Sequence, residues 1–368
     1  MSEKKNTKAI TSLTVSSPGR ICLFGEHQDY LMLPVISAAI SLRISIEGIR
    51  RNDTRVKINL PDIKSKVQFS LGEELPYTTE RDYFRSVINV LRSHEYAPLF
   101  GFDTEVRGKI PINAGTSSSS ALVVSWVKFL SRFGDRWQEF SPRKCAQLAY
   151  EAEVLEFDEP GGMMDHYATS YGGVLYLDFF PALSIQPLQA RLKSFVLGDS
   201  SEPKDTQDIL ARVKNAVLNI TQRLRVKYKD FSLNTVEYDK LDLYDKGLTR
   251  KQRLLLKGTV RNRDITREAH ILFQRKTFDA QIFASLLNEQ QAILCDILKI
   301  STPKIDRMIN AGLKAGALGG KINGSGGGGC MFVYAPKDPE VIAEAIAREG
   351  GTPYIIHIDE GTRIDRVK

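Results

Sequence analysis

Alternating apolar and polar positions predict several β-strands along the chain. The apolar run over residues 20–24 indicates a strand that delivers the next residues to a turn, and residues 35–49 continue as β-branched, strand-like sequence. Further strands are expected over residues 101–112, 172–180 and 331–334. Each is bordered by glycine, proline or polar residues, so the pattern predicts strands that end in turns.

Apolar residues at helical spacing predict helices over residues 82–93 and 121–130 and a mostly helical segment over residues 266–310. Another helix is expected to begin at Ser141 and Pro142, because serine is a favoured N-cap and proline fits the first helical position. That helix carries Glu151 and Glu153 and is expected to end near Pro160. Residues 181–260 are polar and charged, and we interpret them as an irregular domain junction with some helix.

Composition is that of an ordinary globular protein, with 42% apolar and 26% charged residues among 368. No apolar run reaches the length of about 18 residues that a membrane helix needs, and residues 1–8 lack the apolar core of a signal peptide. The cysteines at 22, 145, 295 and 330 are widely spaced and have no zinc-site pattern, which is typical of reduced thiols. We therefore expect a cytoplasmic protein that does not bind a membrane.

The net charge of +7 comes from short basic groups with acidic residues among them. Nucleic-acid binders show basic stripes interleaved with aromatic residues, and this chain shows none, so no nucleic-acid partner is expected. The excess charge favours anionic small molecules such as nucleotides. The sequence leaves monomer and dimer open as oligomeric states.

A Gly/Ser-rich loop before a buried helix is the first candidate site. It comprises Asn113, Ala114, Gly115, Thr116, Ser117, Ser118, Ser119 and Ser120. Small residues let backbone N–H groups approach an anion, and the helix N-terminus behind them adds a positive dipole. The serine hydroxyls suit magnesium, which prefers oxygen ligands. The loop is not a Walker-type P-loop, and an ordinary serine-rich surface loop is the alternative.

Two carboxylates form the second candidate. Glu153 lies near a helix end and Asp165 follows the Gly161-Gly162 turn. One carboxylate beside a triphosphate holds magnesium, and a second accepts the proton of an attacking hydroxyl or orients it, as phosphoryl transfer requires. Solvated surface carboxylates are the alternative.

A polar turn after Arg20 is the third candidate. Glu26, His27 and Asp29 place three hydrogen-bonding side chains within four residues, a density that suits a polyhydroxylated ligand. Arg20 at the strand end would stabilise developing phosphoryl charge. The alternative for His27 is an imidazole whose hydrogen bonds are satisfied within the protein.

Four consecutive glycines at residues 326–329 are the fourth candidate. Such a run costs folding entropy, which indicates that the backbone passes close to a ligand or another loop. A flexible linker fits poorly, because a strong strand follows at once.

These four features resemble, in order, the GHMP kinase superfamily (galactokinase, homoserine kinase, mevalonate kinase and phosphomevalonate kinase), and most closely its galactokinase-like sugar-1-kinases. Residues 18–30, PGRICLFGEHQDY, are similar to the galactokinase signature. Residues 111–121 resemble the family's phosphate loop, usually of Gly-Leu-Ser-Ser-Ser-Ala type, and residues 319–330 resemble its C-terminal glycine motif. The spacing from Glu153 to Asp165 matches the family's metal ligand and catalytic aspartate.

The resemblance implies an α+β chain with a ribosomal-S5-like N-terminal domain, a ferredoxin-like C-terminal domain and ATP between them. We place the domains at residues 1–185, with the phosphate loop and acceptor motif, and 186–368, with the glycine motif. The activity implied is ATP-dependent phosphorylation of the anomeric hydroxyl of a monosaccharide, with ATP and Mg²⁺ as cofactors.

The resemblance also implies roles for individual residues. Asp165 would orient or deprotonate the acceptor, and Arg20 would stabilise the transferring phosphoryl group. The remaining roles are sugar binding by Glu26, His27 and Asp29, phosphate binding by residues 113–120, magnesium binding by Ser119 and Glu153, and support of the phosphate loop by Gly326, Gly327 and Gly328.

The chain departs from the galactokinase pattern in ways that put galactose itself in doubt. Cys22 stands where the signature usually has asparagine, His166 replaces the usual glutamine, and Leu31 follows Asp29-Tyr30 in place of Asn-Gly-Gly. A mevalonate-kinase-like activity on a non-sugar alcohol is one alternative, although Asp29 and Tyr30 replace smaller, more apolar residues of that branch. A non-catalytic sugar sensor is another, but it would require loss of a catalytic or phosphate-loop residue, and all are present.

Overall fold

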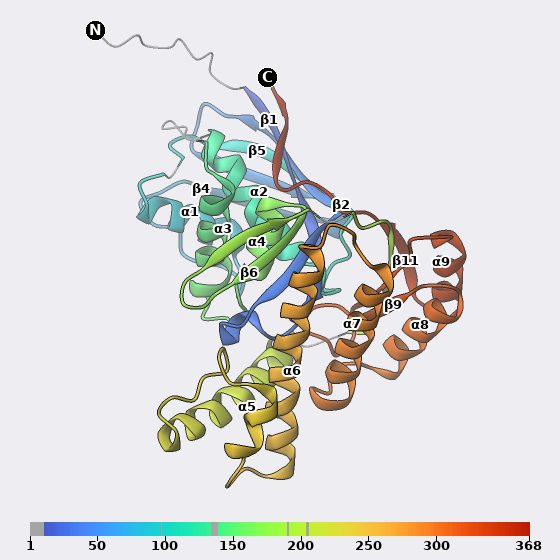
Figure 1. Ribbon diagram of the computed structural model, residues 1–368. Coiled ribbons are helices and arrows are strands. Elements are labelled where there is room, and N and C mark those ends of the chain that lie inside the picture. Colours follow the sequence, from blue (N-terminus) through green and yellow to red (C-terminus); the bar gives the residue numbers. More distant parts are fainter. Residues whose placement is uncertain (1–10, 97, 134–138, 190, 204–205) are drawn as a thin grey trace.

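The structure is a computed structural model, and it describes residues 11–96, 98–133, 139–189, 191–203 and 206–368 (Figure 1). Among these residues, eight strands form a first sheet with the path β12-β1-β2-β5-β3-β4, in which β6 also pairs with β2 and β7 pairs with β6. The strands are β1 (Ser12–Phe24), β2 (Val35–Arg50), β3 (Arg55–Leu60), β4 (Ser65–Ser70), β5 (Phe102–Gly108), β6 (Val174–Asp178), β7 (Ser184–Leu188) and β12 (Arg363–Val367).

The long strand β2 changes partner along its length. Its first residues pair with β6, and its last residues pair with β5, while β1 runs antiparallel along most of it. Strand β1 lies between β12 and β2, and its end at Phe24 leads into the turn that follows.

Helices α2 (Ser118–Phe133) and α4 (Met164–Tyr171) contact this sheet directly, and α1 (Tyr83–Ser93) and α3 (Pro142–Tyr150) pack on α2. Helix α2 contacts β1, β2, α3 and α4, and its buried Trp126 packs on Phe84 of α1 and Phe102 of β5. The predicted cap at Ser141 is confirmed, because its side chain accepts a hydrogen bond from the backbone N–H of Lys144. Helix α2 begins at Ser118, three residues earlier than the sequence predicted, so the last serines of the loop are helical.

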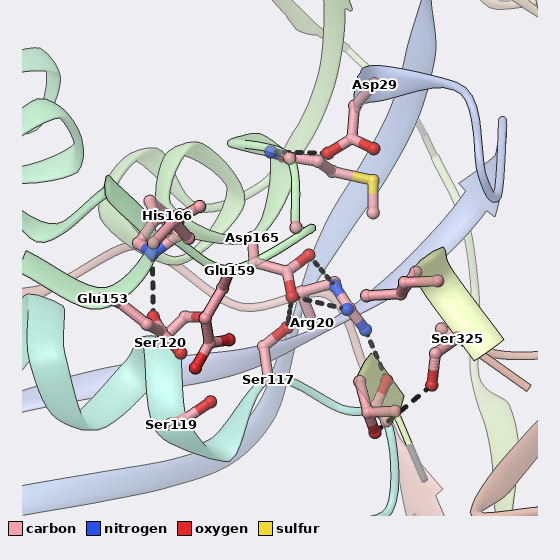
Figure 2. A pocket seen from close by; sticks show the side chains of 18 of the residues that line it. Arg20, Asp29, Ser117, Ser119, Ser120, Glu153, Glu159, Asp165, His166 and Ser325 are labelled. Carbon is pink, nitrogen blue, oxygen red and sulfur yellow. Dashed lines mark hydrogen bonds and ion pairs between the residues drawn. The ribbon is translucent and has the colours of Figure 1, made fainter. Parts of the chain in front are cut away.

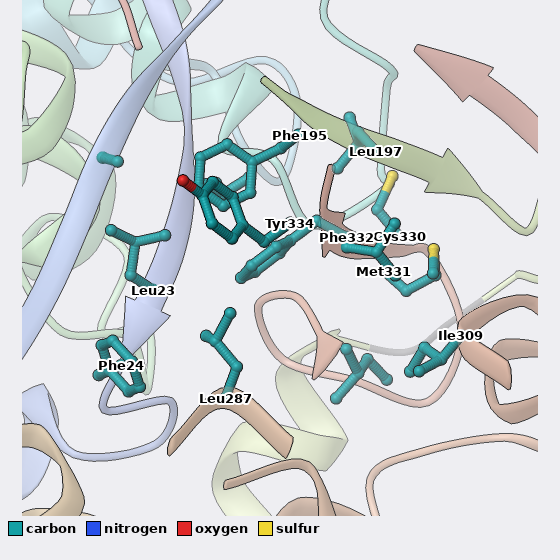
Figure 3. Close-up of a cluster of buried hydrophobic side chains, with 14 of the residues drawn as sticks. Leu23, Phe24, Phe195, Leu197, Leu287, Ile309, Cys330, Met331, Phe332 and Tyr334 are labelled. Atoms are coloured by element: carbon teal, nitrogen blue, oxygen red, sulfur yellow. The ribbon is translucent and has the colours of Figure 1, made fainter. Parts of the chain in front are cut away.

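A second, antiparallel sheet has the order β11-β8-β10-β9, with β8 (Phe195–Asp199), β9 (Gly319–Ile322), β10 (Cys330–Tyr334) and β11 (Thr352–Ile356). It packs against α7 (Ala280–Ala292), α8 (Pro303–Lys314) and α9 (Pro339–Arg348). The core between them includes Phe195, Phe332 and Tyr334, and Leu23 and Phe24 from the end of β1 join it (Figure 3). Because β1 enters this core, it connects the two sheets at the point where the site lies.

The prediction of an irregular domain junction with some helix over residues 181–260 underestimates the helix in this segment. The segment contains α5 (Thr206–Lys227) and the first part of α6 (Arg250–Phe273), and Figure 1 shows these two helices side by side below the sheets. The buried residues of α5 recur at helical spacing, at Val213, Val217, Ile220 and Leu224. The many charged residues between them mask that spacing when the segment is read by composition alone.

The chain's end returns to the first sheet, where β12 pairs with β1. The predicted boundary between the domains, after residue 185, falls inside strand β7. The division of the chain into these two domains stays a prediction. The mostly helical prediction for residues 266–310 is confirmed by the end of α6, by α7 and by α8. Of the helices in the described part of the chain, none is both long and apolar enough to cross a membrane.

Candidate active site

The segments singled out from the sequence converge on one cavity of about 170 Å³ (Figure 2). Its lining comes from the end of β1 and the turn after it, the loop before α2, the turn before α4, the first two turns of α5 and the loop between β9 and β10. Arg20, Glu26, His27, Asp29, Glu153, Asp165 and most of the predicted phosphate loop lie in this lining.

An ion pair between Arg20 and Asp165 lies in the cavity. The Arg20 Nε and Nη2 atoms donate to the two carboxylate oxygens of Asp165, each at 2.7 Å. Asp165 is placed by the first turn of α4, and the Ser117 hydroxyl donates to its Oδ2 at 2.5 Å. The Arg20 side chain is 5% exposed and that of Asp165 is 26% exposed, so Asp165 is the member of the pair that a ligand can reach.

These contacts set the ionisation of Asp165. Burial raises the pKa of the carboxyl, but the charge of Arg20 and the hydrogen bonds from Arg20 and Ser117 outweigh it and hold the pKa of Asp165 below its ordinary value. Asp165 is therefore an anion at neutral pH, able to accept a hydrogen bond from a hydroxyl group.

The loop before α2 has the backbone of an anion-binding turn. Asn113, Gly115 and Ser117 all have φ between +57° and +84°, and the 16-residue helix α2 begins directly after them. Alternating residues of this kind turn successive N–H groups toward one side, and the helix N-terminus adds positive potential there. The predicted phosphate loop thus has a suitable conformation, and its role in binding ATP stays a proposal.

The glycine motif between β9 and β10 packs on this loop backbone to backbone. A Cβ at Gly324 would lie 2.8 Å from the carbonyl oxygen of Gly115, and one at Gly329 would lie 2.7 Å from that of Ala114. The N–H of Cys330 donates to the same Ala114 carbonyl at 2.7 Å. A side chain at either glycine would push the phosphate loop away.

The middle glycines meet other segments. Cβ atoms at Gly326, Gly327 and Gly328 would collide with Ile300, Ile209 and Glu202, respectively. Gly324 and Gly329 therefore contact the phosphate loop directly. The three glycines between them let the motif pass between α5 and the segment before α8.

Glu153 and Ser119 line the cavity from two helical segments. Glu153 lies in a π-helical turn over Glu151–Leu155, and its Oε2 is 2.8 Å from Nε2 of the buried His166. Hydroxyl and carboxylate oxygens are donors that fit Mg²⁺. No group of three His, Cys, Asp or Glu side chains in the described ranges is placed to hold a metal alone.

The turn after β1 orders three polar side chains in different ways. Glu26 is 1% exposed, and its carboxylate pairs with Lys321 and also accepts from the Gly324 N–H. The His27 ring donates from Nε2 to the Ser325 carbonyl at 3.0 Å, so its Nδ1 accepts from the Tyr30 hydroxyl. The predicted roles of Glu26 and His27 in sugar binding stay predictions.

Asp29 lies in the 3₁₀ turn η1 (Asp29–Leu31), and its carboxylate is held by backbone groups. Oδ1 accepts from the N–H of Tyr30 at 2.9 Å, and Oδ2 accepts from the N–H of Met164, the neighbour of Asp165, at 3.2 Å. A Cβ at Gly162 would lie 1.9 Å from Oδ2, so this glycine makes room for the carboxylate. Burial and then the charge of Asp165 raise the pKa of Asp29.

Several lining residues were not found from the sequence. Arg81 pairs with Glu159 at 2.8 Å at one side of the cavity, and Thr206 and Leu210, one helical turn apart on α5, line another part. Arg81 and Glu159 do not belong to any motif that was recognised in the sequence. Helical spacing could have placed the α5 pair on one face, but the segment was taken for a junction.

Comparison with known proteins agrees with this geometry. The family described as GHMP kinases N terminal domain matches residues 82–173, and the one described as GHMP kinases C terminal matches residues 271–352. The galactokinase galactose-binding signature matches residues 4–48. The chain belongs to the GHMP kinase superfamily. It is accordingly a small-molecule kinase with the two-domain fold of that superfamily, for which ATP is the co-substrate.

Relatives of the chain fall in two branches of these kinases. It is 29% identical to the mevalonate kinase of Thermococcus sibiricus, over 96% of this chain and 98% of the relative. It is 24% identical to the galactokinase of Haemophilus influenzae, over 97% and 96%. The crystal structure of Lactococcus lactis galactokinase complexed with galactose superimposes with a TM-score of 0.85 at 23% identity, over 96% of this chain and 95% of that one.

Proposed function

We propose that this kinase transfers the γ-phosphoryl group of ATP to the anomeric hydroxyl of a monosaccharide, giving a sugar 1-phosphate and ADP. The observation that carries the proposal is the position of Asp29. Its carboxylate is bound to the backbone of the residue next to Asp165, so a hydroxyl-binding group and the candidate catalytic carboxylate face one cavity. The match of residues 4–48 to the galactose-binding signature supports a sugar as the ligand of this turn.

Each group of residues in the cavity would have a separate role in phosphoryl transfer. The loop over residues 113–120 would bind the phosphates of ATP, while Ser119 and Glu153 would hold a magnesium ion that neutralises phosphate charge. Asp165 would accept a hydrogen bond from the acceptor hydroxyl and take its proton as the new O–P bond forms. Arg20 would stabilise the transferring phosphoryl group. Because phosphoryl transfer depends mainly on positioning and charge stabilisation, a carboxylate with a lowered pKa is adequate for this role.

A mevalonate-like alcohol is the second candidate acceptor, favoured by the identity to the mevalonate kinases of Thermococcus sibiricus and Pyrococcus furiosus over nearly the whole chain. An assay of ATP consumption across monosaccharides, mevalonate and homoserine separates the candidates. We expect a monosaccharide to give the highest kcat/KM, with phosphate on the anomeric carbon, visible as phosphorus–carbon coupling in NMR. Turnover of mevalonate alone, or phosphate on the C6 hydroxyl, would overturn the proposal.

Replacement of Asp29 tests the acceptor side of the cavity. We expect Asp29→Ala to lower kcat/KM for the sugar by about 10- to 100-fold, since an unpaired buried hydroxyl costs about 1–3 kcal/mol, while KM for ATP barely changes. Steady-state kinetics with each substrate varied in turn provides the measurement. Asp178→Ala is the control, because Asp178 lies at the end of β6 and not in the cavity lining. A defect confined to KM for ATP would contradict the assignment.

Replacement of Ser119 tests the donor side. We expect Ser119→Ala to raise KM for Mg-ATP by about tenfold, the effect of losing one hydrogen bond or metal ligand worth about 1.4 kcal/mol. The sugar KM should stay close to that of the parent. Titration of the parent and the variant with a non-hydrolysable ATP analogue at several magnesium concentrations checks the result. Unchanged affinity at every magnesium concentration would remove Ser119 from the nucleotide site.

A further inference from the structure

Asn323 follows β9, and its buried side chain joins two segments that lie far away in the sequence. Its Oδ1 accepts from the backbone N–H of Cys22 at 2.8 Å, and its Nδ2 donates to the carbonyl oxygen of Gly115 at 2.8 Å. Its own N–H donates to the Cys330 carbonyl at 2.9 Å. The carboxamide therefore connects β1 to the phosphate loop, and the backbone of Asn323 adds a bond to the end of the glycine motif.

Lys321 adds a second connection from β9 to the same residue of β1. Its Nζ donates to the Cys22 carbonyl at 2.9 Å and pairs with Glu26, and the side chain is fully buried. Both backbone polar groups of Cys22 are thus satisfied by side chains two positions apart on the other sheet. Backbone groups at this depth need such partners, and here the partners fix how the end of β1 lies against β9.

The carbonyl of Gly115 receives two donors. Besides Nδ2 of Asn323, Nη1 of Arg20 donates to it at 2.5 Å, while the other two donors of the guanidinium bind Asp165. A carbonyl oxygen has two lone pairs, so both contacts form together. The Arg20 guanidinium consequently binds Asp165 through Nε and Nη2 and the Gly115 carbonyl through Nη1. Asn323 helps to hold that carbonyl in place.

We propose that Asn323 is a positioning residue for phosphoryl transfer. By holding the phosphate loop against β1, it keeps the Gly115 carbonyl where Arg20 binds it, and so keeps Arg20 aligned with Asp165 and with the bound phosphates. Cys22 stands where the galactokinase-type signature has asparagine, and the carboxamide beside it belongs to Asn323. The inference rests on the proposed function for the acceptor and on the phosphate-loop assignment for the nucleotide.

Asn323→Ala tests the proposal against a matched control, Gln291→Ala. Gln291 also presents a side-chain carboxamide to this strand, accepting from the Ile322 N–H at 2.8 Å. Its Nε2 donates to Ser301 and Asp306, which lie outside β1 and the phosphate loop. We expect Asn323→Ala to lower kcat by about 10- to 100-fold, because a displacement of about 1 Å in a catalytic group costs about 10²-fold. The acceptor KM should change little, and Gln291→Ala should keep the parent's kcat even where its thermal stability falls.

A second variant keeps the test decisive if Asn323→Ala does not fold. Asn323→Asp preserves the size of the side chain and the acceptor for the Cys22 N–H, but it sets a carboxylate oxygen against the Gly115 carbonyl and offers Arg20 a competing partner. We expect its kcat to be at or below that of Asn323→Ala.

Calorimetry with the β,γ-imido analogue of ATP and Mg²⁺, without acceptor, measures the phosphate loop separately. Both Asn323 variants should bind it more weakly than Gln291→Ala does. Failure of every sugar in the panel would reject the proposed function and leave this binding result to decide the inference. If kcat and nucleotide affinity of both Asn323 variants match those of Gln291→Ala, Asn323 has no positioning role.

Discussion

Asp165→Asn should lower kcat by about 10²- to 10⁴-fold, the range typical of a lost general base or orienting group, and leave the fold intact. The amide keeps the shape of the carboxylate but loses its charge and replaces one acceptor oxygen with an NH₂ group. In the parent, both oxygens accept from Arg20, and Oδ2 also accepts from Ser117. The amide cannot satisfy these donors and also accept a proton from an acceptor hydroxyl.

The measurement is kcat at saturating ATP and acceptor, combined with the thermal unfolding midpoint and the affinity for a non-hydrolysable ATP analogue. Asp199→Asn is the control, because Asp199 caps the end of β8 by accepting from the Ser201 N–H at 2.8 Å and does not line the cavity. It should keep the activity of the parent. If Asp165→Asn retains activity within a few-fold of the parent, Asp165 has no part in the mechanism.

The sequence predicted those parts of the site that can be recognised from residue type within a short segment. Arg20, the loop over residues 113–120, Glu153 and Asp165 were each recognised from residue type and local context, and the structure brings them around one cavity. Turns rich in glycine and serine, and helix starts such as Ser141 and Pro142, depend on backbone preferences that act over a few residues. Such features are visible in one dimension.

The contacts that join these parts were not predictable in the same way. Asn323 and Lys321 bind the backbone of Cys22 across about 300 positions. Both lie in the glycine motif over residues 319–330, but the motif does not indicate the partners of these two side chains. The turn that contains Glu26 suggests a ligand, but only the fold shows that its carboxylate also pairs with Lys321. Partners at such separations depend on how the two sheets meet.

The error in the segment between the domains has a different cause. Helix α5 has a narrow apolar face, and its many charged residues made the segment look irregular. The apolar face packs with α6 and with the turn around Leu31 and Leu33, which places Thr206 and Leu210 in the cavity lining. A periodicity count in place of a composition estimate would have indicated the helix.

Arg20→Gln should reduce kcat by about 10²- to 10³-fold, the usual effect of removing one donor that stabilises transition-state charge. It should also reverse the pH dependence of stability that Asp165 contributes. In the parent, the pKa of Asp165 is below its ordinary value mainly because Arg20 opposes the effect of burial. The ionised carboxylate therefore stabilises the fold above the ordinary pKa, and this stability is lost as the pH falls through the lowered pKa.

Without the Arg20 charge, burial should dominate and raise the pKa of Asp165 above its ordinary value. The protonated carboxyl then favours the folded state at acid pH, and that stability is lost as the pH rises through the new pKa. Unfolding midpoints measured across mildly acid to neutral pH should thus fall with rising pH for Arg20→Gln relative to the parent. The double variant Arg20→Gln/Asp165→Asn cannot titrate at this position, so it should lose the extra pH dependence and be more stable than Arg20→Gln at neutral pH. A double variant that is less stable than Arg20→Gln at neutral pH would show that the buried charge of Asp165 is not what the Arg20 guanidinium compensates.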